Sequence, residues 1–408
     1  MSTTEISTTE DSATRFRPTR RALLTGLGLS ALLAGCGVEL APLGPTPGPA
    51  TPTIPTPGPT VPAAETLGTG SVSMALLVPL SGSGAAVGRT LRNAAQLALS
   101  DLAAPDLRIA VRDTGGTAAG AAAAAQAALA GGAELILGPV FADEVRAVSP
   151  IARAAGIPVL AFSTDVSVAA PGVYLLNVLI AQEVSTIVGA AANQGKRGFA
   201  ALLPNDAYGT VAEAAFRQAV ARAGGRVAAV QRYNPDEASA LAGAQAIVAA
   251  GGNVDAVLIP EGGAVAPFLA QTLVTAGLDT NAVLLLGSGQ WNDPGVYTNA
   301  ALVGGQFPSP PLDQFQAFAN HYRATFADTP QPIAGLAYEG IVLAAGLVRT
   351  AGTARFQPAS LQRAGGFRLD VNGLVRLNAD GTNARGLAVY RVTGSAPALV
   401  VAAPTTFA

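Results

Sequence analysis

Between residues 71 and 290, short apolar runs alternate with longer segments in which apolar residues recur every three or four positions. Runs such as 71–80 and 198–204 are almost continuously apolar, which is typical of strands buried on both faces of a parallel sheet. A helical spacing follows the first run at Val87, Leu91, Ala95, Ala98 and Leu102. Strand-helix alternation predicts βαβ units, whose right-handed crossovers place helices on both faces of each sheet.

This pattern occurs twice, which predicts an α/β chain of two doubly wound parallel-sheet lobes. The first run has strands near 71–80, 107–113, 133–139 and 157–163. The second has strands at 198–204, 226–233, 255–260 and 282–287, with helices near 182–193, 209–223, 238–250 and 264–276. Two long helices are predicted near 312–326 and 333–349. Residues 365–392 read as short strands joined by Asn-Gly and Asp-Gly turns.

Composition excludes several classes of function. The net charge is −2 and only 12% of the residues are charged, so nothing indicates the basic patch of a nucleic-acid-binding protein. Beyond the N-terminal leader we see no run of 18 apolar residues, and we therefore expect no transmembrane helix. The length that remains after the leader is better suited to two lobes than to a single core.

The only cysteine, Cys36, ends a short apolar segment that follows Arg15, Arg17, Arg20 and Arg21. This order is that of a secretory signal, predicted to span residues 1–36, and the segment is too short to span a membrane. Residues 33–36, Leu-Ala-Gly-Cys, resemble the lipobox of bacterial lipoproteins, which implies that Cys36 carries a lipid. An ordinary buried cysteine is the alternative. Arg20 and Arg21 also resemble a twin-arginine signal, and ordinary export remains equally open.

Residues 37–70 are predicted to be a linker. Proline alternates with threonine and glycine in this segment, which favours an extended polyproline II conformation that cannot pack into a core. At about 3.1 Å per residue, such a tether could reach up to about 100 Å. A lipid anchor followed by a semi-rigid tether would hold the folded domain, 71–408, away from a membrane surface.

Five segments together resemble the type 1 periplasmic binding proteins, in the leucine/isoleucine/valine-binding branch. They are 76–99, 134–163, 201–220, 336–348 and 373–392. The resemblance implies two lobes that face each other across a cleft, with three chain crossings expected near 178–182, 307–311 and 362–367. Lobe 1 would then comprise 71–180 and 308–362, and lobe 2 would comprise 181–307 and 363–408.

Ligands of open α/β sheets bind beyond the carboxyl ends of the strands, so the residues that follow the strands are the candidate site. The lobe 1 candidates are Ser81, Ser83, Ala142, Asp143, Ser163 and Thr164. The lobe 2 candidates are Tyr208, Glu261, Gln290 and Trp291. Hydroxyl groups can hold a carboxylate, acidic groups can hold an ammonium, and an aromatic ring can cover an apolar tail.

The resemblance adds roles for some of these residues. In the amino-acid binders, hydroxyl groups of lobe 1 grip the ligand and a tyrosine of lobe 2 closes over it, which Ser163, Thr164 and Tyr208 match in type and place. The segment Val-Phe-Ala-Asp at 140–143 departs from the small hydroxyl residues that are usual there. Gln290 and Trp291 stand where an acidic group is common. Packing or capping roles are the alternative for each candidate.

We expect no catalytic, cofactor or metal site. The glycine-rich part of the leader is not in a strand-turn-helix context, and residues 81–88 lack the ending of a P-loop. His321 is the only histidine, so a zinc site or a nucleophile-histidine pair is not expected. A hydrolase is retained only as the remaining hypothesis, because any two carboxylates could meet in space.

Two non-catalytic functions remain. The first is a regulator that resembles the penicillin-binding protein activators and would contact a peptidoglycan synthase; the anchor, the tether and the altered site favour it. The second is the substrate-binding lipoprotein of an ABC importer, which would contact an ABC permease and carry a branched-chain amino acid or a related small amide. Either would be periplasmic and lipid-anchored, and Gly37 after the cysteine favours the outer over the inner membrane.

Overall fold

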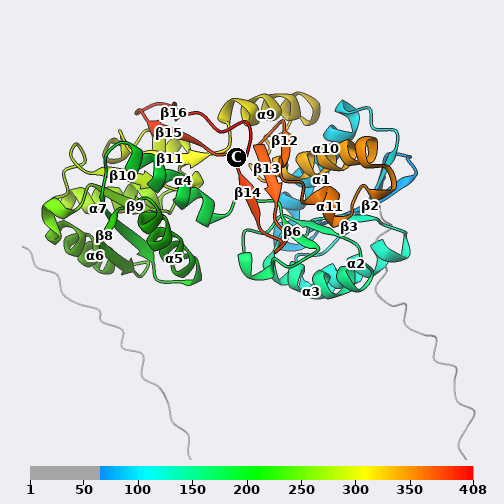
Figure 1. Ribbon diagram of the computed structural model, residues 1–408, viewed down its shortest axis with the longest axis horizontal. Helices are drawn as coiled ribbons and strands as arrows, with labels where there is room; N and C mark the ends of the chain where they lie inside the picture. Colours follow the sequence, from blue (N-terminus) through cyan, green and yellow to red (C-terminus); the bar gives the residue numbers. More distant parts are fainter. Residues whose placement is uncertain (1–64, 408) are drawn as a thin grey trace, which may run out of the picture. The chain divides into compact units, whose positions relative to one another are not determined.

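The computed structural model describes residues 65–407, which form two lobes, each built on a mainly parallel sheet with helices on both faces (Figure 1). Cys36, the predicted signal segment 1–36 and the linker residues up to 64 lie outside the described residues. The expected fold class, two doubly wound α/β lobes, is confirmed. The eight strands and six helices whose ranges were predicted above are all found, with ends within two residues of those expected.

Lobe 1 contains a six-stranded sheet with the order β1-β3-β2-β4-β5-β6, in which only β1 is antiparallel to its neighbour. Its strands are β1 (Glu65–Leu67), β2 (Val72–Val78), β3 (Leu107–Asp113), β4 (Leu135–Leu137), β5 (Val159–Ala161) and β6 (Val173–Leu175). Its helices are α1 (Ala85–Asp101), α2 (Ala118–Ala130), α3 (Ala142–Ala154), α9 (Leu312–Phe326), α10 (Ala334–Ala351) and α11 (Pro358–Leu361).

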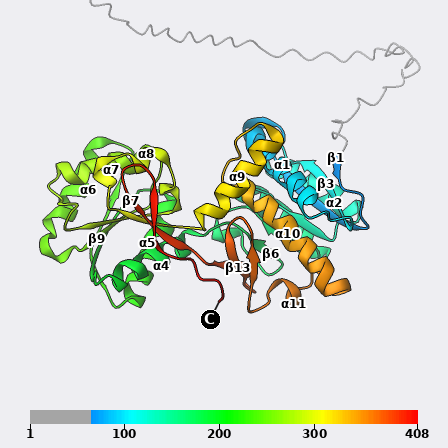
Figure 2. The same ribbon diagram turned by 90° about the horizontal axis from the view of Figure 1, so that it is seen from above.

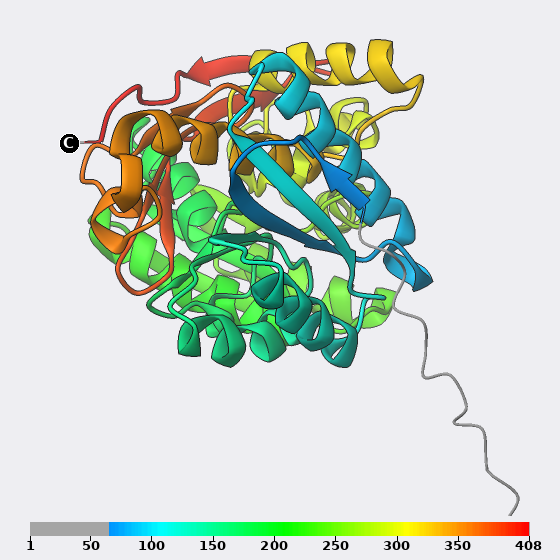
Figure 3. The same cartoon turned by 90° about the vertical axis from the view of Figure 1, so that its right-hand side faces the viewer.

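The side chains of β2 explain why helices cover both faces of this sheet. Met74 and Leu76 are buried against residues of α1, α9 and α10, whereas Ala75 and Leu77 are buried against α2 and α3. Because successive side chains of a strand point to opposite faces, a strand apolar at every position needs two helical layers. Figure 3 shows lobe 1 from its outer side, with its helices on either side of the strands.

Lobe 2 repeats this arrangement with the sheet order β16-β15-β11-β10-β9-β7-β8. Its strands are β7 (Gly198–Pro204), β8 (Arg226–Tyr233), β9 (Ala256–Ile259), β10 (Leu284–Gly287), β11 (Gln306–Ser309), β15 (Ala388–Val392) and β16 (Pro397–Val401). Its helices are α4 (Ile180–Asn193), α5 (Ala207–Arg222), α6 (Glu237–Ala249), α7 (Val265–Thr275) and α8 (Pro294–Tyr297). The carboxylates of Asp206 and Asp236 cap α5 and α6 by accepting backbone N–H groups at 2.8 Å.

The chain passes between the lobes three times. The first passage joins β6 to α4 and overlaps the predicted segment 178–182, and the second joins β11 to α9 within the predicted segment 307–311. The third passage joins β14 (Asn383–Arg385) to β15, about twenty residues later than expected.

The predicted assignment of residues 363–387 to lobe 2 is therefore wrong. These residues form a three-stranded sheet of β12 (Phe367–Leu369), β13 (Gly373–Leu377) and β14. Phe367, Leu369 and Val375 are buried in the lobe 1 core. The guanidinium of Arg385 lies 3.3 Å from the carboxylate of Glu339 in α10, and both side chains are fully buried. Figure 2 shows β13 beside α10.

The C-terminal end of the predicted linker belongs to the folded lobe 1. Glu65–Leu67 pair with β3 as an antiparallel edge strand, Leu67 is buried, and Glu65 forms an ion pair with Arg92 of α1. Residues 65–67 therefore belong to the folded lobe, because the apolar side chain of Leu67 gains from burial and the exposed edge of β3 gains a hydrogen-bonded neighbour.

Within the described residues, one helix, Ala334–Ala354, is long and apolar enough to cross a membrane by length and composition alone. Most of this segment is buried in the lobe 1 core, where Ala337, Ile341 and Ala344 are fully inaccessible. Its apolar character is explained by packing on all sides, as expected for a core helix.

Candidate functional site

A cavity of about 800 Å³ lies between the two lobes, a volume typical of small-molecule sites. Both lobes and the first two crossing segments line it. Its polar lining residues are Thr164, Asp165, Asn177, Glu183, Tyr208, Gln290, Asn292, Asp293, Ser309 and Asn372. Its larger apolar lining residues are Val166, Val178, Ile180, Val211, Leu312, Phe315, Ile333 and Leu336.

Lobe 2 presents Tyr208 and Gln290 to this cavity, as predicted from their positions after strands. The Tyr208 hydroxyl donates to the carbonyl of Pro260 at 3.2 Å, and the Gln290 side-chain amide donates to the Tyr208 oxygen at 3.2 Å. Burial and the nearby carboxylates of Glu183 and Glu261 raise the pKa of Tyr208 well above its ordinary value. Tyr208 is thus a neutral phenol held in one position, which suits it to contact a ligand.

Trp291 and Glu261 lie beneath this surface, outside the residues that line the cavity. Trp291 is fully buried, and its indole N–H donates to the Glu261 carbonyl at 2.9 Å. Tyr233 donates its hydroxyl to the Glu261 carboxylate at 3.0 Å. The expectation that Trp291 covers a ligand is not met by this geometry, since its ring packs against the backbone of Gly287, where a Cβ atom would lie 2.1 Å from the ring.

Lobe 1 brings only part of its predicted residues to the cavity. Thr164 lines it, together with its neighbour Asp165. Ser163 is buried beside them, and its hydroxyl oxygen accepts the Asp165 N–H at 3.1 Å. Ser163 therefore shapes the loop that carries Thr164 and does not itself line the cavity.

The remaining lobe 1 candidates lie elsewhere. Ser81 and Ser83 are exposed and lie outside the cavity. The half-buried Ala142 and the exposed Asp143, at the start of α3, also lie outside it, and Asp143 pairs with Arg146. The loops that follow β2 and β3 are instead joined to each other by hydrogen bonds. The Asp113 carboxylate accepts the N–H groups of Leu80, Ser81 and Gly115 at 2.8, 3.2 and 2.7 Å.

Sequence reasoning missed the apolar side of the cavity. Phe315 of α9, together with Ile333 and Leu336 at the start of α10, contributes lobe 1 side chains from late in the chain. The signal that could have found them is the second crossing, near 307–311, because a segment that joins two lobes leads directly into the space between them.

Sequence reasoning also missed Glu183, in the first turn of α4, directly after the first crossing. Burial raises its pKa from 4.5 to about 7, and the nearby Gly289 amide only partly opposes this shift. A Cβ atom at Gly289 would lie 2.5 Å from the Glu183 carboxylate oxygen, so the glycine makes room for the carboxyl group. Glu183 thus places an acid beside the 289–291 segment of lobe 2, where the family comparison had suggested that one was missing.

Among the residues that the structure describes, none of those lining the cavity is lysine, arginine or histidine. Within 65–407 no three histidine, cysteine or acidic side chains are grouped as metal ligands would be. The cavity can therefore offer carboxylate, amide and hydroxyl groups together with apolar side chains, and both lobes contribute both kinds.

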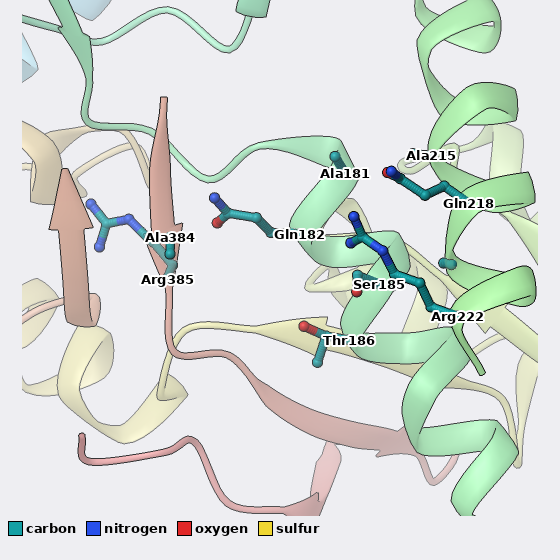
Figure 4. Close-up of a pocket in the computed structure, with 10 residues that line it drawn as sticks. Ala181, Gln182, Ser185, Thr186, Ala215, Gln218, Arg222, Ala384 and Arg385 are labelled. Atoms are coloured by element: carbon teal, nitrogen blue, oxygen red, sulfur yellow. The ribbon is translucent and has the colours of Figure 1, made fainter. Parts of the chain in front are cut away.

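A smaller cavity of about 290 Å³ lies between α4, α5 and β14 (Figure 4). Gln182 of α4 extends toward β14, and its side-chain amide donates to Asn383, while Gln218 and Arg222 project from α5. Its volume is at the lower end for a ligand site, and lobe 1 contributes only Ala384 and Arg385 to it. The larger cavity is therefore the candidate site.

Comparison with solved structures places this fold among binding proteins of ABC transporters, at identities that bear on the fold alone. A periplasmic ligand-binding protein of a branched-chain amino acid ABC transporter from Burkholderia xenovorans is 18% identical, with a TM-score of 0.66 over 81% of this chain and 94% of that chain. The branched-chain amino acid transporter substrate-binding protein of Streptococcus pneumoniae, in complex with isoleucine, is 19% identical, with a TM-score of 0.59 over 82% and 99%.

A solute-binding protein from Rhodopseudomonas palustris, in complex with 3,4-dihydroxybenzoic acid, is 19% identical, with a TM-score of 0.60 over 82% and 97% of the two chains. The comparison with curated proteins gave no match. The family model described as "Periplasmic binding protein" matches residues 71–396, which span both lobes. The chain therefore belongs to the periplasmic binding protein family.

Proposed function

We propose that this chain is the substrate-binding component of an ABC importer and that the cavity between the lobes holds its ligand. The observation that carries the proposal is the cavity itself, which is of ligand size and is lined by both lobes and by the segments that join them. A branched-chain amino acid or a related small amide has polar groups and an apolar body that suit such a mixed lining. The protein would act in the periplasm without catalysis and deliver its ligand to an ABC permease.

This is the second of the two functions considered from the sequence. The first, regulation of a peptidoglycan synthase, finds no support in the family match or in the three solved structures described above. The altered residues that favoured it have another interpretation. Glu183 brings a carboxyl group close to Gly289, beside Gln290, and residues 140–143 are not among those that line the cavity.

Isothermal titration calorimetry of the full chain against branched-chain amino acids and their amides tests the proposal. We expect a saturable heat for at least one compound. Tyr208→Phe should lower the affinity for that compound about two- to tenfold, because one neutral hydrogen bond contributes roughly 0.5–1.5 kcal/mol. Tyr338→Phe is the matched control, since that hydroxyl donates to Asp101 at 2.9 Å outside the cavity. A chain that binds no compound of the panel, yet is captured by a peptidoglycan synthase, would refute the importer function.

Lipid attachment at Cys36 is part of the same proposal, since two or three acyl chains would hold the protein stably at a membrane. Cys36→Ala should leave an unprocessed precursor that incorporates no radiolabelled palmitate. Equal labelling of the variant and the natural chain would exclude the anchor.

A further inference from the structure

We infer that residues 402–407, which follow β16, form a strap that ties lobe 2 to lobe 1 and holds the two lobes at the angle seen in this structure. The family model matches residues 71–396, so the strap lies beyond the part of the chain that it covers. The inference adds a conformational restraint to the proposed function, and its test needs no ligand.

The strap begins on lobe 2. β16 pairs with β15 in antiparallel register, with Val401 opposite Val389, and Ala403 still packs against the lobe 2 core. After Ala403 the chain leaves that core, and Figures 1 and 2 show it running from β16 to the side of lobe 1, next to β13. Within the described residues this is a further link between the lobes, and it is held on lobe 1 by packing contacts that can be released.

Pro404 makes the first of these contacts. It lies over Gly386, whose N–H donates to the Leu374 carbonyl of β13 at 2.9 Å. A Cβ atom at Gly386 would lie 3.0 Å from the Pro404 carbonyl oxygen and 3.1 Å from its ring. Gly386 lies between β14 and β15. The glycine therefore lets the strap pass directly over the third passage of the chain between the lobes.

Phe407 makes the second contact. Its ring stacks on the guanidinium of Arg376 in β13, which lies 4.6 Å from the ring centroid. A Cβ atom at Gly366, just before β12, would lie 2.4 Å from the Val375 carbonyl oxygen and 2.9 Å from the Phe407 ring. The ring is half-buried. Attraction between the cation and the aromatic face, together with the burial of apolar surface, holds Phe407 on lobe 1.

The strap is short enough for these contacts to act on the angle between the lobes. Only residues 402–406 separate β16 from Phe407, and a fully extended chain of that length spans about 20 Å. Pro404 limits its conformations further by fixing φ. A rotation of one lobe against the other moves the two attachments of the strap relative to each other, so the strap must shift or detach when the angle changes.

Such a restraint influences how the cavity responds to a ligand. Domains that close around a ligand pivot on a few hinge residues, and a ligand shifts their equilibrium only by its differential affinity for the two arrangements. A strap that docks at one angle adds the free energy of its docking to that arrangement. It therefore sets the balance between lobe arrangements before any ligand binds.

The distance between spin labels on the two lobes tests the inference. In a chain with Cys36→Ser, the substitutions Ala119→Cys on α2 and Ala246→Cys on α6 place one label on an exposed position of each lobe. Double electron–electron resonance of this chain should give one narrow distance distribution. Deletion of residues 402–408 and, separately, Phe407→Ala should each at least double its width.

Phe268→Ala is the matched control, because Phe268 is an exposed phenylalanine of α7, within lobe 2. It should leave the distribution unchanged. Arg376→Gln should broaden the distribution less than Phe407→Ala does. The double variant should be no broader than Phe407→Ala alone, because both substitutions remove the same contact.

An unchanged width in both the deletion chain and Phe407→Ala would overturn the inference, and so would equal broadening in Phe268→Ala. Thermal unfolding of the same samples distinguishes release of the strap from loss of the fold, since the strap variants should melt close to the natural chain. If the deletion chain does not fold, Phe407→Ala alone decides. Because no ligand takes part, the inference and the importer function can fail independently.

Discussion

The parallel strands of lobe 1 and lobe 2 have the same order, β3-β2-β4-β5-β6 in the first and β8-β7-β9-β10-β11 in the second. The two lobes nevertheless contribute lining residues to the cavity from different kinds of segment. Lobe 2 does so mainly through the segments that directly follow its strands, which carry Tyr208 in the first turn of α5 and Gln290 and Asp293 after β10. In lobe 1 the segments after β5 and β6 and the turn between β12 and β13 reach the cavity, and the helices α9 and α10 add Phe315 and Leu336 to its apolar lining.

Two lobes of the same topology therefore line the cavity with side chains from different kinds of segment. The rule that ligands bind beyond the carboxyl ends of parallel strands holds well for lobe 2. In lobe 1, the carboxylate of Asp113 ties the first two loops together, and late segments of the chain cover the space that these loops leave. Four experiments test this difference between the lobes.

The largest effect is expected from Glu339→Ala in lobe 1. It leaves the fully buried guanidinium of Arg385 without its carboxylate partner, which typically costs about 3–5 kcal/mol. Glu213→Ala is the lobe 2 control, since Glu213 pairs with Arg217 and Arg232 at a more accessible site, where pairs contribute about 0–1 kcal/mol. Urea denaturation measures both. Equal losses in the two variants would mean that the β12–β14 sheet does not depend on this pair.

A chain that begins at Ser71 should be less stable than one that begins at Val61 by about 2 kcal/mol. Removal of β1 exposes the β3 edge and loses the burial of Leu67, an apolar side chain of a size that contributes about 1.5–3 kcal/mol. In lobe 2 the strand that corresponds to β3 is β8, and it already forms the edge of its sheet. Thermal unfolding measures the difference, and identical melting temperatures would show that β1 adds nothing to lobe 1.

Two serines at equivalent positions allow a direct comparison of the lobes. Ser163 follows β5, and its hydroxyl oxygen accepts one N–H, whereas Ser288 follows β10, accepts the Gln290 N–H at 3.2 Å and donates to the Pro260 carbonyl at 2.6 Å. With about 1 kcal/mol for each hydrogen bond, Ser288→Ala should cost about 2 kcal/mol and Ser163→Ala about 1 kcal/mol. Urea denaturation of the two variants in parallel checks the order, and the reverse order would contradict it.

The smallest effect concerns the pH dependence of stability. The Glu183 pKa is about 7 in the folded chain and 4.5 ordinarily, so this group favours folding below pH 4.5, and that contribution is lost as the pH rises through 7. Because the cavity admits water, we expect this group to change the free energy of unfolding by only about 1 kcal/mol. Melting temperatures between pH 4 and pH 8 should fall less in Glu183→Gln than in the natural chain. If the melting temperature of both proteins changed equally with pH, the raised pKa of Glu183 would be contradicted.

The sequence was sufficient for the fold because buried parallel strands and their helices leave strong local periodicities, as at 198–204 and 312–326, whose ends were predicted without error. Tyr208, Gln290 and Thr164 could be placed at the cavity because each follows a strand. Glu183 and Phe315 could not, because their position depends on where the chain turns from one lobe into the other. The lobe assignment of β12–β14 depends on the long-range pair of Arg385 and Glu339, which leaves no local pattern.

The third passage of the chain, between β14 and β15, affects how the protein must be made. Lobe 1 gains β12–β14 only after about 385 residues have left the ribosome, and lobe 2 gains β15 and β16 last of all. During synthesis, the lobe 1 core therefore waits for the apolar side chains of β12 and β13, and β11 of lobe 2 waits for its neighbour β15. Such late, non-local contacts slow folding. A premature stop codon near residue 360 would leave two incomplete lobes instead of one finished and one missing, and both halves of the product would be open to proteolysis.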